Sequence, residues 1–195
     1  MFQHSMQNAY IGEVYEYSYD FRNKTLAGVQ ADWWSFPEWT DWVSFNSNGM
    51  YKSAWWYKRA EYPVDISTAS KVTLIWHITK WYSDIDAWFW FRDIQGSYWL
   101  SCAITTGYSE TLFRMDNWWS NYNFASYWAM AQWSYIITII IDFVNKTIYF
   151  SYWTNSGTYS LSDTQVTTIR WSDVMWCWVC KNTNNYIPDI SIKIE

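Results

Sequence analysis

The side chains best suited to chemistry in this sequence are aromatic rings that stand beside amides and carboxylates. Residues 116–124, DNWWSNYNF, combine two adjacent tryptophans with a tyrosine and three asparagines. Flat aromatic faces stack on the C–H surfaces of sugars and also anchor protein interfaces, while amides donate and accept hydrogen bonds. The pattern predicts a ligand-binding loop. Its residues are Asn117, Trp118, Trp119, Asn121, Tyr122 and Asn123.

A second group of such side chains follows the alternation of residues 85–93. Side chains alternate across a strand, so Asp86, Trp88, Trp90 and Arg92 are expected on one face. We expect His77, on the preceding strand of the chain, to lie beside this face. Such a face could bind a sugar, or it could form an outer sheet surface whose charges are solvated.

Catalytic and metal-binding motifs are absent from the sequence. No serine or cysteine partner can be placed beside His77. Cys177 and Cys180 are three positions apart in a predicted strand and therefore lie on opposite faces, and no second pair completes a zinc site. We expect buried thiols, no catalytic residue, no cofactor and no metal, and the sequence does not indicate a bound Ca²⁺.

Two N-x-[ST] sequences begin at Asn23 and Asn145, both in predicted turns. Each asparagine would be accessible to a glycosylation machinery if the protein met one. Chance occurrence in a chain rich in asparagine and threonine explains the two matches equally well.

The elements that would position these groups are strands, arranged around one long hairpin at residues 134–153. Alternating apolar residues give this hairpin one wholly apolar face. These residues are Tyr135, Ile137, Ile139, Ile141, Phe143, Ile148, Phe150 and Tyr152. Asn145 and Lys146 are expected to form a two-residue turn, because asparagine tolerates the left-handed conformation. Such a face needs a second sheet to cover it, which predicts a β-sandwich.

Further strands are expected on both sides of this hairpin. Strict alternation predicts strands over residues 14–21 and 71–79, and a hairpin from 85–93 to 98–104. Shorter strands are predicted at 49–57, 111–115, 165–171, 174–180 and 187–194. An irregular loop that ends in a short strand is predicted at 30–48, turns or loops at 62–65, 116–124 and 154–157, and either strand or helix at 125–133. Roughly ten to twelve short strands are typical of a jelly roll. We therefore expect one all-β domain over residues 1–195, with 1–12 as an N-terminal arm.

Composition narrows the classes of partner. The chain of 195 residues has 13 basic and 18 acidic side chains and a net charge of −5, without the clustered Lys and Arg that nucleic-acid binding requires. Its 19 Trp, 17 Tyr and 10 Phe favour strands. No apolar run reaches the roughly 18–20 residues of a membrane-spanning helix, and the N-terminus lacks a signal-peptide pattern. We expect an extracellular protein, or one on a particle surface, without membrane insertion.

The strand order resembles the concanavalin A-like lectin/glucanase superfamily of jelly rolls. Three segments carry the resemblance: WFWFRDIQGSYWL at 88–100, IIIDFVNKTIYFSYW at 139–153 and YIPDISIKIE at 186–195. It implies an antiparallel two-sheet sandwich with either carbohydrate binding or glycoside hydrolysis. The laminarinase-like hydrolases carry E-x-D-x-x-E, and here Asp84, Asp86 and Phe89 stand at those positions. The missing third acid argues against retaining catalysis.

We therefore predict a non-catalytic carbohydrate-binding or surface-adhesion module. The first alternative is a structural protein of a virion or extracellular filament, whose aromatic surface is buried between identical subunits. The second is a laminarinase-like glycoside hydrolase. In an extended segment one ring of each doublet, Trp33–Trp34, Trp55–Trp56 and Trp118–Trp119, faces away from the core. The exposure of these rings decides how much aromatic surface is open to a partner.

Overall fold

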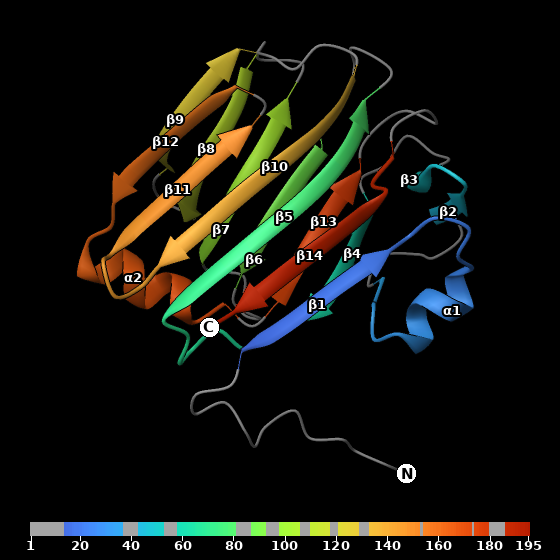
Figure 1. Ribbon diagram of the computed structural model, residues 1–195, viewed down its shortest axis with the longest axis horizontal. Helices are drawn as coiled ribbons and strands as arrows, with labels where there is room; N and C mark the ends of the chain where they lie inside the picture. Colours follow the sequence, from blue (N-terminus) through green and yellow to red (C-terminus); the bar gives the residue numbers. More distant parts are fainter. Residues whose placement is uncertain are drawn as a thin grey trace.

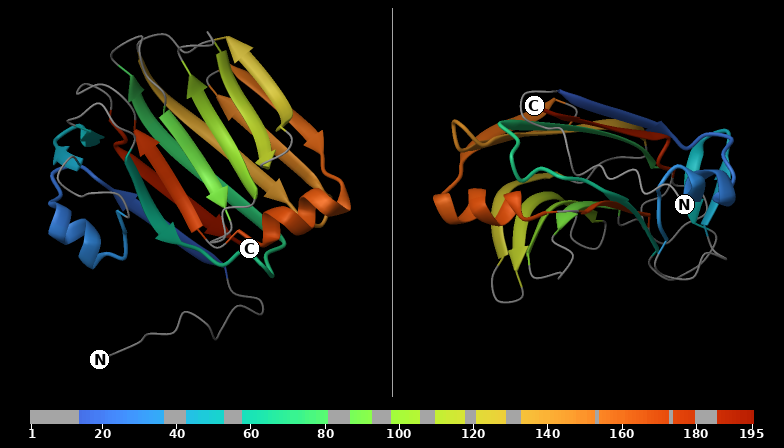
Figure 2. Two further views of the ribbon diagram at one scale, coloured as in Figure 1. Left: turned by 180° about the vertical axis from the view of Figure 1, so that it is seen from behind. Right: turned by 90° about the horizontal axis from the view of Figure 1, so that it is seen from below.

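The computed structural model describes residues 14–36, 43–52, 58–80, 87–92, 98–105, 110–117, 121–128, 133–152, 154–172, 174–179 and 186–195. Within them, two six-stranded antiparallel sheets pack face to face, accompanied by a two-stranded sheet and two short helices (Figure 1 and Figure 2). The prediction of an all-β, two-sheet jelly-roll sandwich is confirmed. In the described part of the chain, no helix has the length and apolar character needed to cross a membrane.

The first sheet, sheet A, contains both ends of the described chain and the predicted central hairpin. Its strand order is β1-β14-β5-β10-β11-β12. The strands are β1 (Tyr15–Asp20), β14 (Asp189–Ile194), β5 (Lys71–Lys80), β10 (Trp133–Asp142), β11 (Thr147–Tyr152) and β12 (Asn155–Ser160). The hairpin register pairs Ile139 with Phe150 and Asp142 with Thr147. In this strand order β1 and β14, which come from opposite ends of the described chain, are neighbours.

The second sheet, sheet B, faces sheet A across the core. Its strand order is β4-β13-β6-β7-β8-β9. The strands are β4 (Lys58–Pro63), β13 (Val174–Val179), β6 (Ala87–Arg92), β7 (Tyr98–Thr105), β8 (Glu110–Asn117) and β9 (Asn121–Trp128). A bulge shifts the β8–β9 register between Phe113 and Arg114. The separate small sheet is the hairpin of β2 (Val43–Asn46) and β3 (Gly49–Lys52).

The core lies between the two large sheets, and the predicted apolar face of the central hairpin forms much of it. All eight residues of that face are at most 7% exposed. On β5 the alternate apolar residues Val72, Leu74, Trp76 and Ile78 are also buried. From sheet B, Phe113 meets Phe150 with ring centroids 4.4 Å apart. Because burial of one large apolar side chain stabilises a fold by about 1.5–3 kcal/mol, this double layer is the main source of stability.

Aromatic rings close the side of the sandwich where β1 and β4 are edge strands. The ring of Tyr17 stacks on that of Tyr62 at 4.3 Å, which links the two sheets. The indole Nε1 of Trp34 donates a hydrogen bond of 3.0 Å to the Tyr17 hydroxyl. Burial raises the pKa of Tyr17 well above its usual value, so this hydroxyl stays protonated. The cluster also fixes the segment that follows helix α1 (Leu26–Ala31).

Both helices differ from the predicted elements. The prediction of a strand at 165–171 is wrong, because α2 (Asp163–Arg170) occupies this segment. The Ser162 hydroxyl accepts a hydrogen bond from Gln165 N at 3.2 Å, and the Gln165 side chain accepts one from Ser162 N at 2.8 Å. This capping box begins the helix. No element was predicted for residues 26–29, where helix α1 begins, and its last two residues lie in the predicted loop at 30–48. Thr25 caps this helix by accepting a hydrogen bond from Gly28 N at 3.1 Å.

Several predicted turns and loops are strands. Asn155 begins β12, and Tyr62 lies within β4. Of the predicted binding loop at 116–124, residues 116–117 end β8 and 121–124 begin β9. The segment 125–128, ambiguous from the sequence, continues β9. In each case a neighbouring strand supplies hydrogen-bond partners that the local sequence does not reveal.

The central turn also differs in detail, since four residues separate the paired Asp142 and Thr147. Lys146, with φ of 51°, takes the left-handed conformation expected for Asn145. The Asp142 carboxylate holds the turn by accepting hydrogen bonds from Asn145 N and Nδ2, both at 2.8 Å. These bonds hold the pKa of Asp142 below its ordinary value.

The hydrogen bonds of the Asp142 carboxylate predict how the stability of the protein changes at acidic pH. A carboxyl whose folded pKa is lowered stabilises the fold above its unfolded pKa of about 3.9, and the contribution is lost as the pH falls through the folded pKa. We expect wild type to exceed Asp142→Asn in stability at neutral pH and the difference to shrink below about pH 4. Urea unfolding of both proteins across pH 2–7 measures it. A difference that is constant with pH would contradict the role of the ionised carboxylate.

Candidate functional site

Strand β4 shows which face of sheet B is turned away from the core. Ala60 and Tyr62 are buried at 2% and 3% exposure, whereas Glu61 is half-buried and Pro63 exposed. Because side chains alternate along a strand, the positions opposite Glu61 and Pro63 on the neighbouring strands lie on the same side of the sheet. We call this side the outer face of sheet B.

Two rows of paired positions cross the outer face of sheet B from β4 to β9. The first row is Glu61, Trp176, Trp90, Ser101, Arg114 and Asn123. The second row is Pro63, Val174, Arg92, Trp99, Asp116 and Asn121. The register therefore brings together four residues that the sequence placed in two separate groups, Trp90, Arg92, Asn121 and Asn123. Trp88 is on the same face in the next row, opposite Trp178 and Ala103.

Two other predicted site residues are described, and they lie outside these rows. Tyr122 is paired with Met115, and both positions belong to the core side of the register. Asn117 ends β8 opposite Tyr98. Trp118, Trp119 and Asp86 lie outside the described residues, as do Asp84 and the doublet Trp55–Trp56. The described residues of the predicted loop are thus divided between the two faces of sheet B.

Three tryptophan positions on this face were not predicted as site residues. Trp176 is directly opposite Trp90, Trp178 is opposite Trp88, and Trp99 is opposite Arg92. The alternation of Trp176 and Trp178 in a predicted strand was the available signal. It did not reveal the site because β13 and β6 are far apart in sequence, and only the sheet pairing makes them neighbours.

The register gives this face two chemically different halves. Tryptophan occupies five positions on the adjacent strands β13, β6 and β7, which together are roughly 10 Å wide. Amide, carboxylate and guanidinium groups occupy the positions on β8 and β9. Rings stack on apolar surfaces, and the polar groups exchange hydrogen bonds with hydroxyls. The arrangement suits a ligand that is both flat and rich in hydroxyls.

The doublet at Trp33 and Trp34 is the one for which the described residues give side-chain exposure. Trp33 is 58% exposed and Trp34 is 2% exposed. The prediction that one ring of a doublet faces away from the core is confirmed here.

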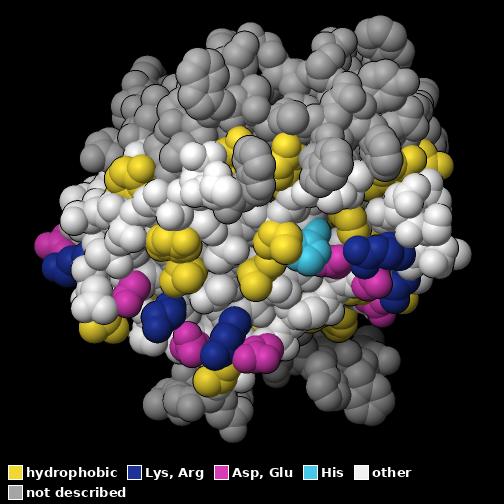
Figure 3. Space-filling model, turned by 45° about the horizontal axis from the view of Figure 1, so that its top comes forward, with side chains coloured by type: hydrophobic (Ala, Val, Ile, Leu, Met, Phe, Trp, Pro, Cys, Tyr) yellow, Lys and Arg dark blue, Asp and Glu magenta, His cyan; other side chains and the backbone are white. Residues whose placement is uncertain are grey.

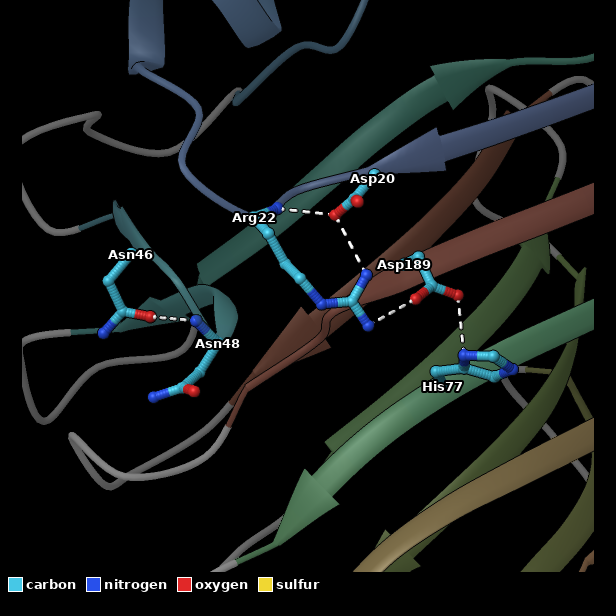
Figure 4. Close-up of polar contacts among 6 residues, drawn as sticks. All are labelled: Asp20, Arg22, Asn46, Asn48, His77 and Asp189. Atoms are coloured by element: carbon cyan, nitrogen blue, oxygen red, sulfur yellow. Dashed lines mark hydrogen bonds and ion pairs between the residues drawn. The ribbon is translucent and has the colours of Figure 1, made fainter.

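His77 is not beside β6, and this prediction is wrong. Its strand β5 belongs to sheet A, whereas β6 belongs to sheet B, so the two strands lie in different layers. On the outward side of sheet A, His77 Nδ1 is 2.7 Å from Asp189 Oδ1 (Figure 4). Asp189 Oδ2 accepts a hydrogen bond of 2.8 Å from Arg22, which also pairs with Asp20 at 3.1 Å. The network joins β1, β14 and β5.

Other charges on sheet A are paired within the chain as well. Lys193 Nζ is 2.8 Å from Glu195 and 3.7 Å from Glu16. Acidic and basic side chains lie next to one another on the surface drawn in Figure 3. Among the described residues, no group of three or more His, Cys, Asp or Glu side chains is arranged to hold a metal ion. Sheet A therefore carries a structural charge network, and sheet B carries the stronger binding pattern.

The two N-x-[ST] asparagines lie in exposed turns, as predicted. Asn23 has a left-handed φ of 56° after β1, and Asn145 lies in the β10–β11 turn. They differ in their hydrogen bonds, because Asn145 Nδ2 donates to Asp142 at 2.8 Å. Modification at either residue stays a prediction.

Comparison with known proteins identifies the fold. No protein-family model and no curated protein matches the sequence. Three solved structures match most of it. The CBM2 module of the evolved Dit of Lactobacillus casei BL23 phage J-1 has 9% sequence identity and a TM-score of 0.65, and the match covers 93% of this chain and 96% of that one. The apo Crh5 transglycosylase has 10% identity and a TM-score of 0.62, with 92% and 83% covered, and peanut lectin with a 9mer peptide has 13% identity and a TM-score of 0.60, with 94% and 98% covered. The protein therefore has the concanavalin A-like, lectin-type jelly-roll fold that its strand order resembles.

Proposed function

We propose that the protein is a non-catalytic carbohydrate-binding module and that the outer face of sheet B is its binding surface. The observation that carries the proposal is the register of β13, β6 and β7, which collects tryptophan positions from segments that are separate in sequence. These positions are Trp88, Trp90, Trp99, Trp176 and Trp178. Stacking on such rings is a common way to bind the apolar face of a sugar.

The polar half of the face supplies the second requirement of sugar binding. Asn121 and Asn123 lie at the outer positions of β9, opposite Asp116 and Arg114 of β8. Amides, carboxylates and guanidinium groups fix hydroxyl groups by hydrogen bonds, and this fixes the orientation of the ring. One surface would thereby combine stacking with directional contacts.

The structural comparisons support a carbohydrate ligand and a location outside the cell. One similar fold is a CBM2 module from a phage protein, and another is peanut lectin. A module exposed to the medium, or carried on the surface of a particle, would meet glycans there. The phage origin of the first structure favours a particle surface as one setting for the same activity.

Binding to a glycan array tests the proposal, followed by titration calorimetry with the best ligand. We expect wild type to bind a defined set of glycans and Trp90→Ala to lose about 5- to 30-fold in affinity, since buried aromatic anchors contribute about 1–2 kcal/mol or more. Tyr149→Ala, on the outward side of sheet A, is the matched control and should bind as wild type. The proposal fails if no glycan binds, or if Trp90→Ala and Trp176→Ala bind as tightly as wild type.

A further inference from the structure

Trp33 combines an exposed ring with an unfavourable backbone conformation. Its side chain is 58% exposed, and its φ of 72° lies in the left-handed region. Glycine usually occupies this position after a helix, because a Cβ is disfavoured there. A bulky residue in such a conformation, with its ring in solvent, points to a role for the ring itself.

The structure holds Trp33 firmly in this place. Its N–H donates to Gln30 O at 3.2 Å, and the next N–H, of Trp34, donates to Val29 O at 3.2 Å. Two residues later Ser35 forms a bridge with Glu61 of β4, through Ser35 N to Glu61 O and Glu61 N to Ser35 O, both at 2.8 Å. The segment after α1 is thus fastened along the edge of sheet B.

Residues 33–36 alternate exposed, buried, exposed, buried along this edge. Trp34 faces the core, where its ring centroid is 5.3 Å from that of Tyr62. Ser35 is paired with Glu61 and is therefore on the outer face of sheet B. Trp33 precedes Ser35 by two residues, so its Cα is at most about 7 Å from that of Ser35. Trp33 lies beside the β4 end of the same rows that contain the other tryptophan positions.

We propose that Trp33 is an outlying stacking platform of the glycan-binding face and that the ligand is an oligosaccharide chain running across the strands. This inference rests on the proposed function. From the Trp33 segment to β7 the path crosses four strand intervals, which is roughly 19 Å. A single sugar ring cannot span that length, whereas a linear chain of several sugars can contact both Trp33 and the central rings.

The variant Trp33→Gly removes the indole ring and leaves the backbone conformation of this residue favourable, so it tests the role of the ring in binding. Glycine adopts the left-handed conformation without strain, so we expect a melting temperature at or above that of wild type. The probes are β-1,3-glucan, β-1,4-glucan, chitin, mannan and galactan oligosaccharides, each as a dimer and a hexamer. In the series that wild type binds, we expect Trp33→Gly to lose about 3- to 10-fold in affinity for the hexamer and nothing for the dimer.

The possible failures point to different conclusions. If wild type binds no glycan on the array and none of these series, the proposed function fails and this inference fails with it. If wild type binds a glycan on the array but no hexamer, this inference alone fails. If Trp90→Ala weakens binding of the hexamer but Trp33→Gly does not, the face binds glycans and Trp33 plays no part. Equal affinity of wild type for dimer and hexamer would also overturn the inference. Tyr149→Ala again serves as the aromatic control on sheet A.

Discussion

Phe150→Ala is expected to destabilise the protein by about 3–5 kcal/mol, the range for removing a fully buried phenylalanine ring. Phe150 is 0% exposed. Its ring centroid lies 4.4 Å from that of Phe113, 5.6 Å from that of Phe124 and 6.2 Å from that of Tyr159. These partners come from β8, β9 and β12, so one side chain of β11 joins strands of both sheets.

The cost should lie at the upper part of that range because the surroundings cannot collapse into the space. Phe150 is paired with Gly157, which has no side chain to fill a cavity. The ring of Tyr159 already lies over Gly157, where an added Cβ would come within 3.0 Å of the ring carbon Cζ. Loss of the Phe150 ring therefore leaves a cavity between the sheets, and the cavity adds to the lost burial.

Urea unfolding followed by intrinsic fluorescence measures the effect, with Tyr149→Ala as the matched control. Tyr149 is the adjacent residue on β11, half-buried on the outward side. Removing its ring should cost roughly 1 kcal/mol or less, because little of it is buried in the core. Equal losses in the two variants would contradict the assignment of the core face of β11.

The strands with strict alternation were predictable from sequence, and the physical reason is local. In β11 each outward residue is more polar than its neighbours, and in β5 and β10 the same holds except at Ile75, Ile136 and Ile140, so burial largely follows from the period of two. The positions of β1 and β14 could be predicted without knowing that the two strands pair, because each alternates on its own. Where one face of a strand is buried, the sequence carries that information.

The elements that were predicted incorrectly depend on interactions that the alternation of apolar and polar residues does not reveal. Helix α2 was predicted as a strand although Ser162 and Gln165, at capping-box spacing, were visible in the sequence. Strand β12, NSGTYS, has a composition typical of a turn and becomes a strand because β11 pairs with it. The two errors differ, since the first overlooked a local signal and the second had none to use.

The site could be predicted only in pieces for the same reason. Trp88, Trp90 and Arg92 share strand β6, so local alternation was enough to group them. Trp176 joins them only through the pairing of β13 with β6. His77 was added to the group by proximity in the chain, but consecutive strands of a jelly roll can lie in opposite sheets.

Gly49→Ala is expected to cost at least about 2–3 kcal/mol, from the sum of backbone strain and steric overlap. Gly49 has φ of 123°, a conformation that residues with a side chain rarely adopt. An added Cβ would also collide with the carbonyl oxygen of Ile187 and would lie 2.6 Å from Cα of Pro188. Both obstacles are backbone atoms, which cannot rotate away as a flexible side chain can.

The collision would open a contact on which β14 depends. Next to Gly49, Met50 N donates to Ile187 O at 3.0 Å, and Ile187 N donates to Met50 O at 2.9 Å. This bridge fastens the β2–β3 hairpin to the segment that leads into β14. We therefore expect Gly49→Ala to lose hydrogen-exchange protection first at the amides of Met50 and Ile187, in addition to its lower urea midpoint.

Gly28→Ala is the matched control for this substitution. Gly28 lies in α1, where alanine is favoured over glycine by about 1 kcal/mol, and its added Cβ would meet only the Thr25 hydroxyl, at 3.2 Å. The stability change should stay within about 1 kcal/mol of wild type. If Gly49→Ala unfolded at the same urea concentration as Gly28→Ala, the close approach of Gly49 to Ile187 could not be what holds the hairpin to β14. A loss of stability in Gly49→Ala but not in Gly28→Ala would show that the absence of a side chain at Gly49 allows the β2–β3 hairpin to contact the segment that leads into β14.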